Sequence, residues 1–149
     1  MSKYKTLKIA VASIIALIAL VLALGYFFVK SIINQRTCEW ANIDNIEVHA
    51  KVNVPSIEGS DCQYNESTNV KRAKFALSPL DMTAYIAQNK LQSFQEGMPI
   101  DEDTFLSFEQ DSHEDANLFG KHVSLGGKEA YALLDSATRE LWVTIQFED

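Results

Sequence analysis

The stretch KIAVASIIALIALVLALGYFFVK, from Lys8 to Lys30, decides how this chain is organised. Between its two lysines, residues 9–29 carry no charge over twenty-one positions. An α-helix rises about 1.5 Å per residue, so such a run covers roughly 30 Å, which is the thickness of the hydrocarbon core of a bilayer. The sequence therefore predicts a membrane-spanning helix near the N-terminus.

A cleaved secretory signal is the alternative interpretation of the same run. Signal peptides also begin with basic residues, but their apolar core is usually about 7 to 15 residues long and ends at a small-residue cleavage site. The nearest such site here is Ala23-Leu24-Gly25, and aromatic residues follow it directly. Cleavage would leave an apolar N-terminus on the product, so we expect the segment to stay in the chain as a signal anchor.

Flanking charges predict the orientation of this anchor. Three lysines precede the run, at positions 3, 5 and 8, whereas Lys30 and Arg36 follow it. Because basic residues near a span resist translocation, we expect a cytoplasmic N-terminus and a C-terminal domain outside the cytoplasm, as in a bacterial inner-membrane protein with a periplasmic domain. The predicted order is a cytoplasmic tail (1–8), a transmembrane helix (9–29), a stalk (30–45) and an extracytoplasmic domain (46–149).

Small residues recur along one side of the apolar run. They are spaced by four, three and four positions, at Ala12, Ala16, Ala19 and Ala23. This spacing places them on one helix face, and small side chains let a second membrane helix approach closely. We expect this face to pack against a partner helix; the alternative is that alanine is simply common in membrane helices.

Charge is divided unequally along the chain. All twenty acidic residues lie after Arg36 with only eight of the thirteen basic residues, so residues 37–149 carry a formal charge of 8 minus 20, or −12. A strongly acidic domain is repelled by phosphate backbones and by anionic lipid headgroups. The composition therefore argues against nucleic acid as a partner. We expect the chain to contact the membrane through its anchor and to bind another membrane or envelope protein.

The chain has two cysteines, Cys38 and Cys62, both outside the apolar run. In an oxidising compartment we expect them to form a disulfide, worth roughly 3 kcal/mol for a loop of about 25 residues. The alternative is two reduced thiols in a cytoplasmic domain. Their spacing is not C-x-x-C and no cluster of Cys or His accompanies them, which argues against a redox motif or a zinc knuckle.

Periodicity predicts strands in the first part of the domain. Residues 46–54 (IEVHAKVNV) alternate apolar and polar side chains, which predicts a half-buried strand closed by Pro55. Residues 56–68 are rich in Ser, Gly, Asp and Asn and predict a loop. Residues 70–77 (VKRAKFAL) alternate again, so a second strand follows, with Lys74 pointing outward.

A helix is predicted after the second strand. The sequence SPLD places Ser78 at the N-cap, Pro79 at the first helical position and Asp81 at the third. The apolar residues then recur at helical intervals to about residue 94, at Leu80, Ala84, Ala87, Leu91 and Phe94. We expect this face to lie on a sheet.

The C-terminal part predicts further strands. Residues 122–127 predict a short strand and a turn, and 129–135 and 141–147 predict two strands joined by a turn. The order of these elements predicts a small α+β domain with two layers, in which one main helix packs on a mostly antiparallel sheet.

Acidic residues gather between Glu96 and Asp115 with no basic residue among them. Neither DEDTFLSFEQDS nor DSHEDANLFGKH has the Gly at position six and the Glu at position twelve of an EF-hand. An irregular site for a divalent cation would use Asp101, Asp103, Asp111 or Asp115. The alternative is a solvated acidic loop.

The chain lacks the usual catalytic motifs. GGKEA at 126–130 lacks two residues that a phosphate loop requires, and the sequence has no GxGxxG or GxSxG. We therefore expect an interaction or accessory protein of the cell envelope without a cofactor. Two alternatives stay open: a binding module for a divalent cation or small cationic ligand at 96–115, and an enzyme that combines two of His49, His113 and His122 with carboxylates.

Overall fold

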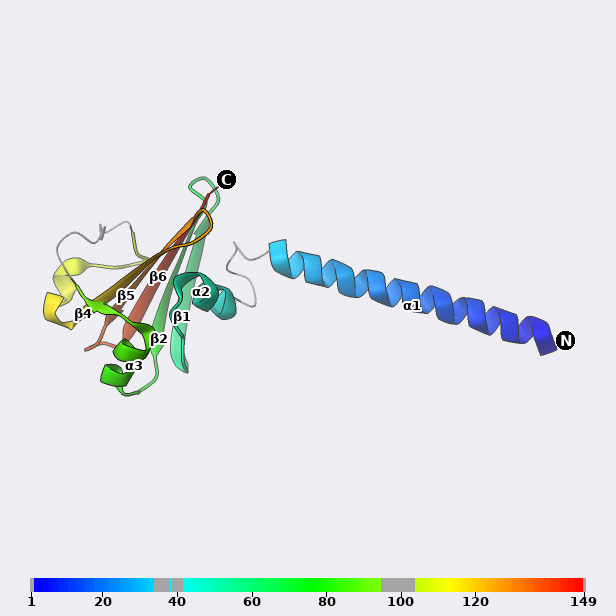
Figure 1. Ribbon diagram of the computed structural model, residues 1–149, viewed down its shortest axis with the longest axis horizontal. Helices are drawn as coiled ribbons and strands as arrows, with labels where there is room; N and C mark the ends of the chain where they lie inside the picture. The colour runs from blue at the N-terminus through cyan, green and yellow to red at the C-terminus, as the bar shows by residue number, and fades with distance from the viewer. Residues whose placement is uncertain (1, 34–37, 39–41, 95–103, 149) are drawn as a thin grey trace. The chain divides into compact units, whose positions relative to one another are not determined.

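The computed structural model describes residues 2–33, 38, 42–94 and 104–148, and it divides into two compact units, Met1–Gln35 and Arg36–Asp149. The first unit consists of helix α1, Ser2–Ile33 (Figure 1). Its stretch Lys8–Val29 is long and apolar enough to cross a membrane, and none of that stretch is buried against other residues. A signal sequence shares these properties, so α1 is a candidate membrane span.

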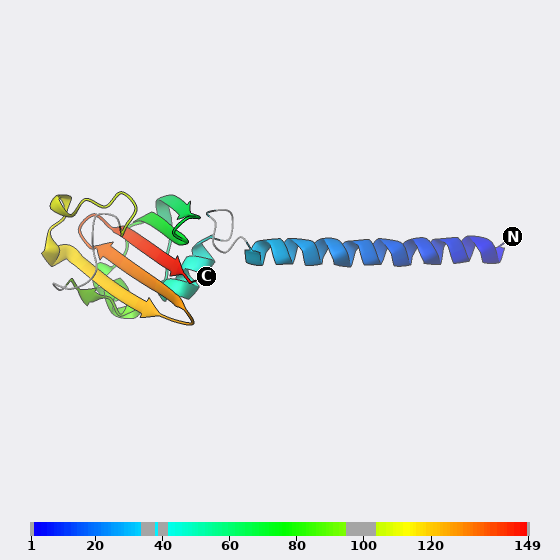
Figure 2. The same cartoon turned by 90° about the horizontal axis from the view of Figure 1, so that it is seen from above.

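The second unit is built on an antiparallel sheet, whose described strands follow the spatial order β1-β2-β6-β5-β4-β3 (Figures 1 and 2). The strands are β1 (Ile57–Asn65), β2 (Val70–Leu77), β3 (Gln92–Ser93), β4 (Leu118–Ser124), β5 (Lys128–Asp135) and β6 (Glu140–Phe147). The α+β class is confirmed, and so are the strands expected at 70–77, 129–135 and 141–147.

One face of the sheet, here called the helix face, carries helices α2 (Asn42–Ala50) and α3 (Met82–Asn89) and the extended segment 51–55 between α2 and β1. Two helices therefore cover it, where one main helix was predicted. Buried side chains of both helices and the segment meet those of β2, β5 and β6 in one core. It includes Ile46, Ala50, Val52, Val54, Phe75, Leu77, Tyr85, Leu134, Leu141, Val143 and Ile145.

Hydrogen bonds fix α3 against the extended segment. The backbone N–H of Asn53 donates to Asn89 Oδ1 over 2.7 Å, and Tyr85 Oη donates to the carbonyl oxygen of Asn53 over 2.6 Å. The Asn89 amide in turn donates to the carbonyl oxygen of Tyr85. Each polar atom named here has a partner inside the protein, so burial of these groups costs little.

The opposite face of the sheet, here called the strap face, is covered by residues 104–117, which we call the strap. The strap contains two single-turn 3-10 helices, η1 (Gln110–Ser112) and η2 (Asp115–Asn117). Its Phe105 and Phe108 pack with Leu118, Leu133 and Trp142 in a second, smaller core. Successive residues of a strand point to opposite faces, which is why Leu133 and Trp142 lie here and their neighbours lie in the larger core.

The strand predicted at residues 46–54 is wrong. The structure has helix α2 to Ala50, followed by the extended segment. Val48, which a strand would have buried, is 59% exposed, whereas Ile46 is fully buried. Two patterns overlap in this stretch: Ile43, Ile46 and Ala50 follow the helical repeat, and Ala50, Val52 and Val54 alternate as an extended chain does.

The loop predicted at residues 56–68 is wrong as well, because residues 57–65 form β1. This strand lies at the edge of the described sheet and most of its side chains are exposed, so it needs no alternation of apolar residues. Pairing with β2, from Ile57 opposite Leu77 to Asn65 opposite Val70, holds it in place.

Helix α3 begins and ends differently from the prediction. Its N-cap is Asp81, whose carboxylate accepts from the backbone N–H of Ala84, and not Ser78. Lys90 adopts a left-handed conformation (φ 55°) that ends the helix, so it does not reach Phe94. Tyr85 and Asn89 form its buried face, whereas Ala84 and Ala87, predicted to be buried, are exposed.

Candidate functional site

The predicted cation ligands are brought together only in part by the structure. Asp101 and Asp103 lie outside the described residues. Asp111 and Asp115 are exposed in the strap, in η1 and η2. Among the residues that the structure describes, no three His, Cys, Asp or Glu side chains come close enough to hold a metal ion. Cation binding at 96–115 therefore stays a prediction.

Cys38 and Cys62 are joined by a disulfide, with their Cα atoms 5.7 Å apart. The bond ties the chain just before α2 to strand β1. The Cys62 side chain is partly buried against the core of the helix face. This pairing is compatible with the predicted oxidising compartment, while the redox state in the cell stays a prediction.

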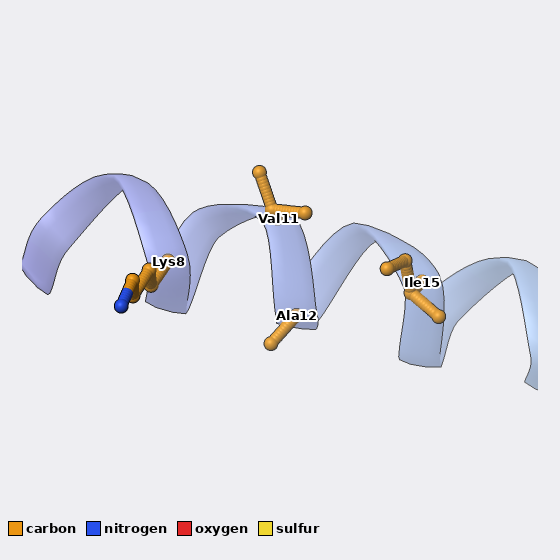
Figure 3. Close-up of a pocket in the computed structure, with 4 residues that line it drawn as sticks. All are labelled: Lys8, Val11, Ala12 and Ile15. Carbon is orange, nitrogen blue, oxygen red and sulfur yellow. The ribbon is translucent and has the colours of Figure 1, made fainter. Parts of the chain in front are cut away.

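The small residues of α1 lie on an exposed helix surface. Figure 3 shows Ala12 between Lys8, Val11 and Ile15, which line a shallow depression along this single helix. Its lining is almost entirely apolar, with the Lys8 side chain at one end. A depression on one exposed helix does not enclose a small ligand. The face is suited to contact with lipid or with another helix.

His122 belongs to an exposed polar cluster on strands β4 and β5. Its Nε2 bonds to one carboxylate oxygen of Glu129, and Ser124 Oγ donates to the other over 2.6 Å. The hydrogen bond from Ser124, and then that from His122, lowers the pKa of Glu129. A catalytic triad needs the imidazole between the hydroxyl and the carboxylate. Here the carboxylate lies between the other two groups, so His122 cannot take the proton of Ser124 directly.

His113 makes a second, buried carboxylate pair. Its Nδ1 lies 2.6 Å from Asp135 Oδ2, and the two side chains are 8% and 2% exposed. Burial by itself raises the pKa of Asp135, but hydrogen bonds from His113 and from the backbone N–H groups of Thr138 and Ala137 outweigh it and hold the pKa below its usual value. Asp135 is therefore a carboxylate that accepts these hydrogen bonds. Its bond with His113 attaches the strap to β5.

Aromatic rings enclose His113. The imidazole stacks on Phe108 with centroids 5.3 Å apart, and it meets the edge of Trp142 at 5.2 Å. Phe108 also meets Trp142 edge to face. Little solvent reaches the imidazole in this arrangement, so it suits a structural contact better than proton exchange with a substrate.

His49 lies half-buried on α2, beside Lys128. Its Nδ1 lies 2.7 Å from the carbonyl oxygen of Asn45, and its Nε2 lies 3.0 Å from Lys128 Nζ. Burial lowers the pKa of His49; the bond to Asn45 opposes this shift, and the charges of neighbouring lysines, Lys128 first, add to it. A neutral ring fits these contacts, donating at Nδ1 and accepting at Nε2, so both nitrogens are already engaged.

Lys71 is a buried cation that sequence reasoning missed. It is 1% exposed, and burial lowers its pKa to about 8. A lysine with a lowered pKa can act as a nucleophile, but only where a substrate reaches it, and this side chain is covered by the core. The alternation of β2 predicts this burial, because residues two and four positions apart in a strand share a face. Lys71 therefore points to the same face as Ala73 and Phe75.

Trp142 is the second residue that the sequence did not single out. It is fully buried under the strap, and its Nε1 finds no hydrogen-bond partner among the described residues. Lys74 Nζ lies 5.2 Å from the centroid of the indole and bonds to Glu140 over 2.7 Å. A buried indole N–H usually finds an acceptor, so this site is incompletely satisfied.

Comparison with known protein families, curated proteins and solved structures finds no match to this chain. Function must therefore be argued from the chemistry of the residues. The three histidines lie on α2, in the strap and on β4, and each contacts a different residue of β5, namely Lys128, Asp135 and Glu129.

Proposed function

We propose that this chain is a single-pass membrane protein that displays an acidic α+β domain outside the cytoplasm and acts by binding another membrane or envelope protein. The exposed apolar surface of α1 carries this proposal. Isoleucine, leucine, valine and phenylalanine side chains of Lys8–Val29 stand about half to two-thirds exposed, with none of the stretch buried inside the protein. Water solvates such a surface poorly, whereas lipid solvates it well.

Two further observations support the location and the mode of action. The Cys38–Cys62 disulfide fits an oxidising compartment, where such bonds persist. In the described part of the domain, each of the three histidines is bonded to a neighbour within the protein. An anchored domain meets other membrane proteins at raised effective concentration, so even a weak interface suffices for function.

Alkaline carbonate extraction of membranes tests the anchor. We expect the full-length chain to stay with the lipid, and a variant with Leu17→Lys and Ile18→Lys to be released, because each lysine at the centre of a span costs about 3 kcal/mol. Val48→Lys is the matched control, since Val48 is as exposed as Ile18 but lies in the folded domain. Release of the unaltered chain would contradict the proposal.

The orientation needs a separate test. Alkaline phosphatase fused after Asp149 folds only outside the cytoplasm, so we expect an active fusion. Its activity should fall when two of the N-terminal lysines, Lys3 and Lys5, are exchanged for glutamine and two lysines are added after Lys30. Rapid labelling of both cysteines by maleimide in native membranes would place the domain in a reducing compartment instead.

A further inference from the structure

We propose that the outer edge of strand β1 is an interaction surface, which accepts an extended, basic segment of a partner protein as one more strand of the sheet. This inference rests on the proposed function as an interaction protein and names the surface and the chemistry of the partner. The surface runs from Gly59 to Asn65, beyond the register shift between Ile57 and Gly59.

Strand β1 is the outermost strand on its side of the described sheet (Figure 1). It pairs with β2 on one side, and no described strand pairs with it on the other. At nine residues it is the longest of the described strands. Its sequence, IEGSDCQYN, contains neither the proline nor the lysine that commonly block an edge strand. An extended peptide can therefore add to this edge by backbone hydrogen bonds.

The register shows which backbone groups of β1 face away from β2. Leu77 donates its backbone N–H to the carbonyl oxygen of Arg139, on the β6 side of β2. Odd-numbered residues of β2 therefore face β6 and even-numbered ones face β1, because backbone groups alternate in an antiparallel ladder. Gln63 lies opposite an even-numbered residue of β2, whereas Ser60 and Tyr64 lie opposite odd-numbered ones. The N–H and C=O groups of Ser60 and Tyr64 consequently point to the outer edge.

A hydrogen bond at Cys62 agrees with this assignment. Cys62 lies between Ser60 and Tyr64 in the same alternation, and its backbone N–H donates to Asp61 Oδ1 over 2.8 Å. An N–H inside the β1–β2 ladder would be directed at β2. Here an exposed side chain of β1 itself receives the bond, as expected for a group on the outer edge.

Charge defines the class of the partner. Three exposed carboxylates lie along the edge, with Glu58 before it, Asp61 in its middle and Glu66 just after it. Among the described residues none of the three forms an ion pair; Lys74, which lies opposite Asp61, bonds to Glu140 instead. A basic strand would supply the missing opposite charges, whereas an acidic strand or a second copy of β1 would add like charges.

Hydrogen exchange of single amides, measured by NMR on the full-length chain in mild detergent, tests the proposal. The probe is a synthetic peptide of alternating threonine and lysine, (Thr-Lys)4, with blocked ends. We expect the amides of Ser60 and Tyr64 to exchange rapidly in the free chain and to slow roughly tenfold or more with the peptide, because they join a ladder. The same peptide with glutamate in place of lysine should give no protection.

Two variants separate strand pairing from general attraction of a basic peptide to an acidic domain. Ser60→Pro removes an N–H that points away from β2, so the β1–β2 ladder is retained while an added strand is blocked. We expect it to weaken peptide binding roughly tenfold, whereas Ser60→Ala should bind as the parent does. Asp61→Lys should weaken binding by a similar factor, and Asp111→Lys, which changes the net charge equally in the strap, should not. If Ser60→Pro prevents folding, the pair Asp61→Lys and Asp111→Lys decides.

Equal peptide affinity in the parent, Ser60→Pro and Asp61→Lys would show attraction to the acidic surface alone and would overturn the proposal, as would unchanged exchange of Ser60 and Tyr64 with the lysine peptide. Slow exchange of both amides in the free monomer would show that another part of this chain covers the edge. Protection that rises with protein concentration, without peptide, would show that a second copy is the occupant. Either result also overturns the proposal. The readout does not depend on whether α1 spans a membrane, so this inference and the proposed function can fail separately.

Discussion

The two faces of the sheet are covered in different ways. On the helix face, two helices and an extended segment bury a large apolar core, and the polar groups of Asn53, Tyr85 and Asn89 are paired. On the strap face, a smaller aromatic core lies under an acidic segment with short 3-10 turns. Within the described residues each side has one buried polar atom without a hydrogen-bond partner, Asn45 Oδ1 on α2 and Trp142 Nε1 under the strap. The difference teaches that one sheet carries two cores of unequal size, a large one under helices and a small aromatic one under a segment with little regular structure.

The largest effect is expected on the helix face. Phe75 is 2% exposed and lies within the large core, so Phe75→Ala should lower the free energy of unfolding by about 3–5 kcal/mol. Urea denaturation followed by far-UV circular dichroism measures this loss. A loss below about 1 kcal/mol would show that the helix face is not the stable side and would break the comparison.

Loss of the disulfide should have the second-largest effect on the free energy of unfolding. Replacing both Cys38 and Cys62 by serine removes a cross-link over a sequence separation of 24, and we expect the free energy of unfolding to fall by about 3 kcal/mol. Reduction of the unaltered chain with dithiothreitol should give the same midpoint in urea. A variant as stable as the parent would mean that the bond adds nothing to the fold.

Phe108→Ala is the matched test on the strap face, because Phe108 is 3% exposed and Phe75 is 2% exposed. If the strap opens as a unit, the loss cannot exceed the free energy that closes it, so we expect only about 1–2 kcal/mol. Hydrogen exchange should accelerate in residues 104–117 and stay slow in β5 and β6. Equal losses at Phe75 and Phe108 would mean that both faces belong to one cooperative core.

The smallest effect is expected from acid. The folded-state pKa of Asp135 lies below its ordinary value of 3.8, so its contribution to stability is present above pH 3.8 and is lost as the pH falls through the folded value. Protection of the strap against hydrogen exchange should therefore weaken at pH values below about 4. Asp135→Asn should abolish this dependence, and a pH response that the variant retains would assign it to other groups.

Sequence patterns predicted the central strands of the sheet better than they predicted the segments that pack on its two faces. The sequences of the central strands β2, β5 and β6 alternate between apolar and other residues, because one face of each strand meets the large apolar core. This requirement makes the strands recognisable in the sequence. Residues 46–54 also alternate, yet packing of Ile46 and Ala50 on the sheet favours a helix there. A period-two pattern cannot separate a strand from a short helix that runs into an extended segment.

The strap shows why the candidate site was harder to predict than the fold. His113 and Asp135 are 22 residues apart, and no local pattern brings them together. The acidic residues of the strap predicted a cation site, but those described point to solvent while its phenylalanines hold it on the sheet. The sequence signal for this attachment is the apolar group Phe105, Leu106 and Phe108 within an otherwise acidic stretch, which predicts a short helix or strand packed on the core; Phe105 and Phe108 do pack there.

The Cys38–Cys62 bond also determines which part of the domain would carry a pull applied to the chain before Cys38. Such a pull would pass through the sulfur atoms of Cys38 and Cys62 to β1, which is paired with β2. Residues 39–61, with α2 among them, lie inside the loop that the bond closes and would carry none of that pull while the bond is intact. Reduction of the disulfide would transfer the pull to α2, which is held on the sheet by side-chain packing. The redox state of Cys38 and Cys62 would therefore decide how much force the domain withstands before α2 detaches.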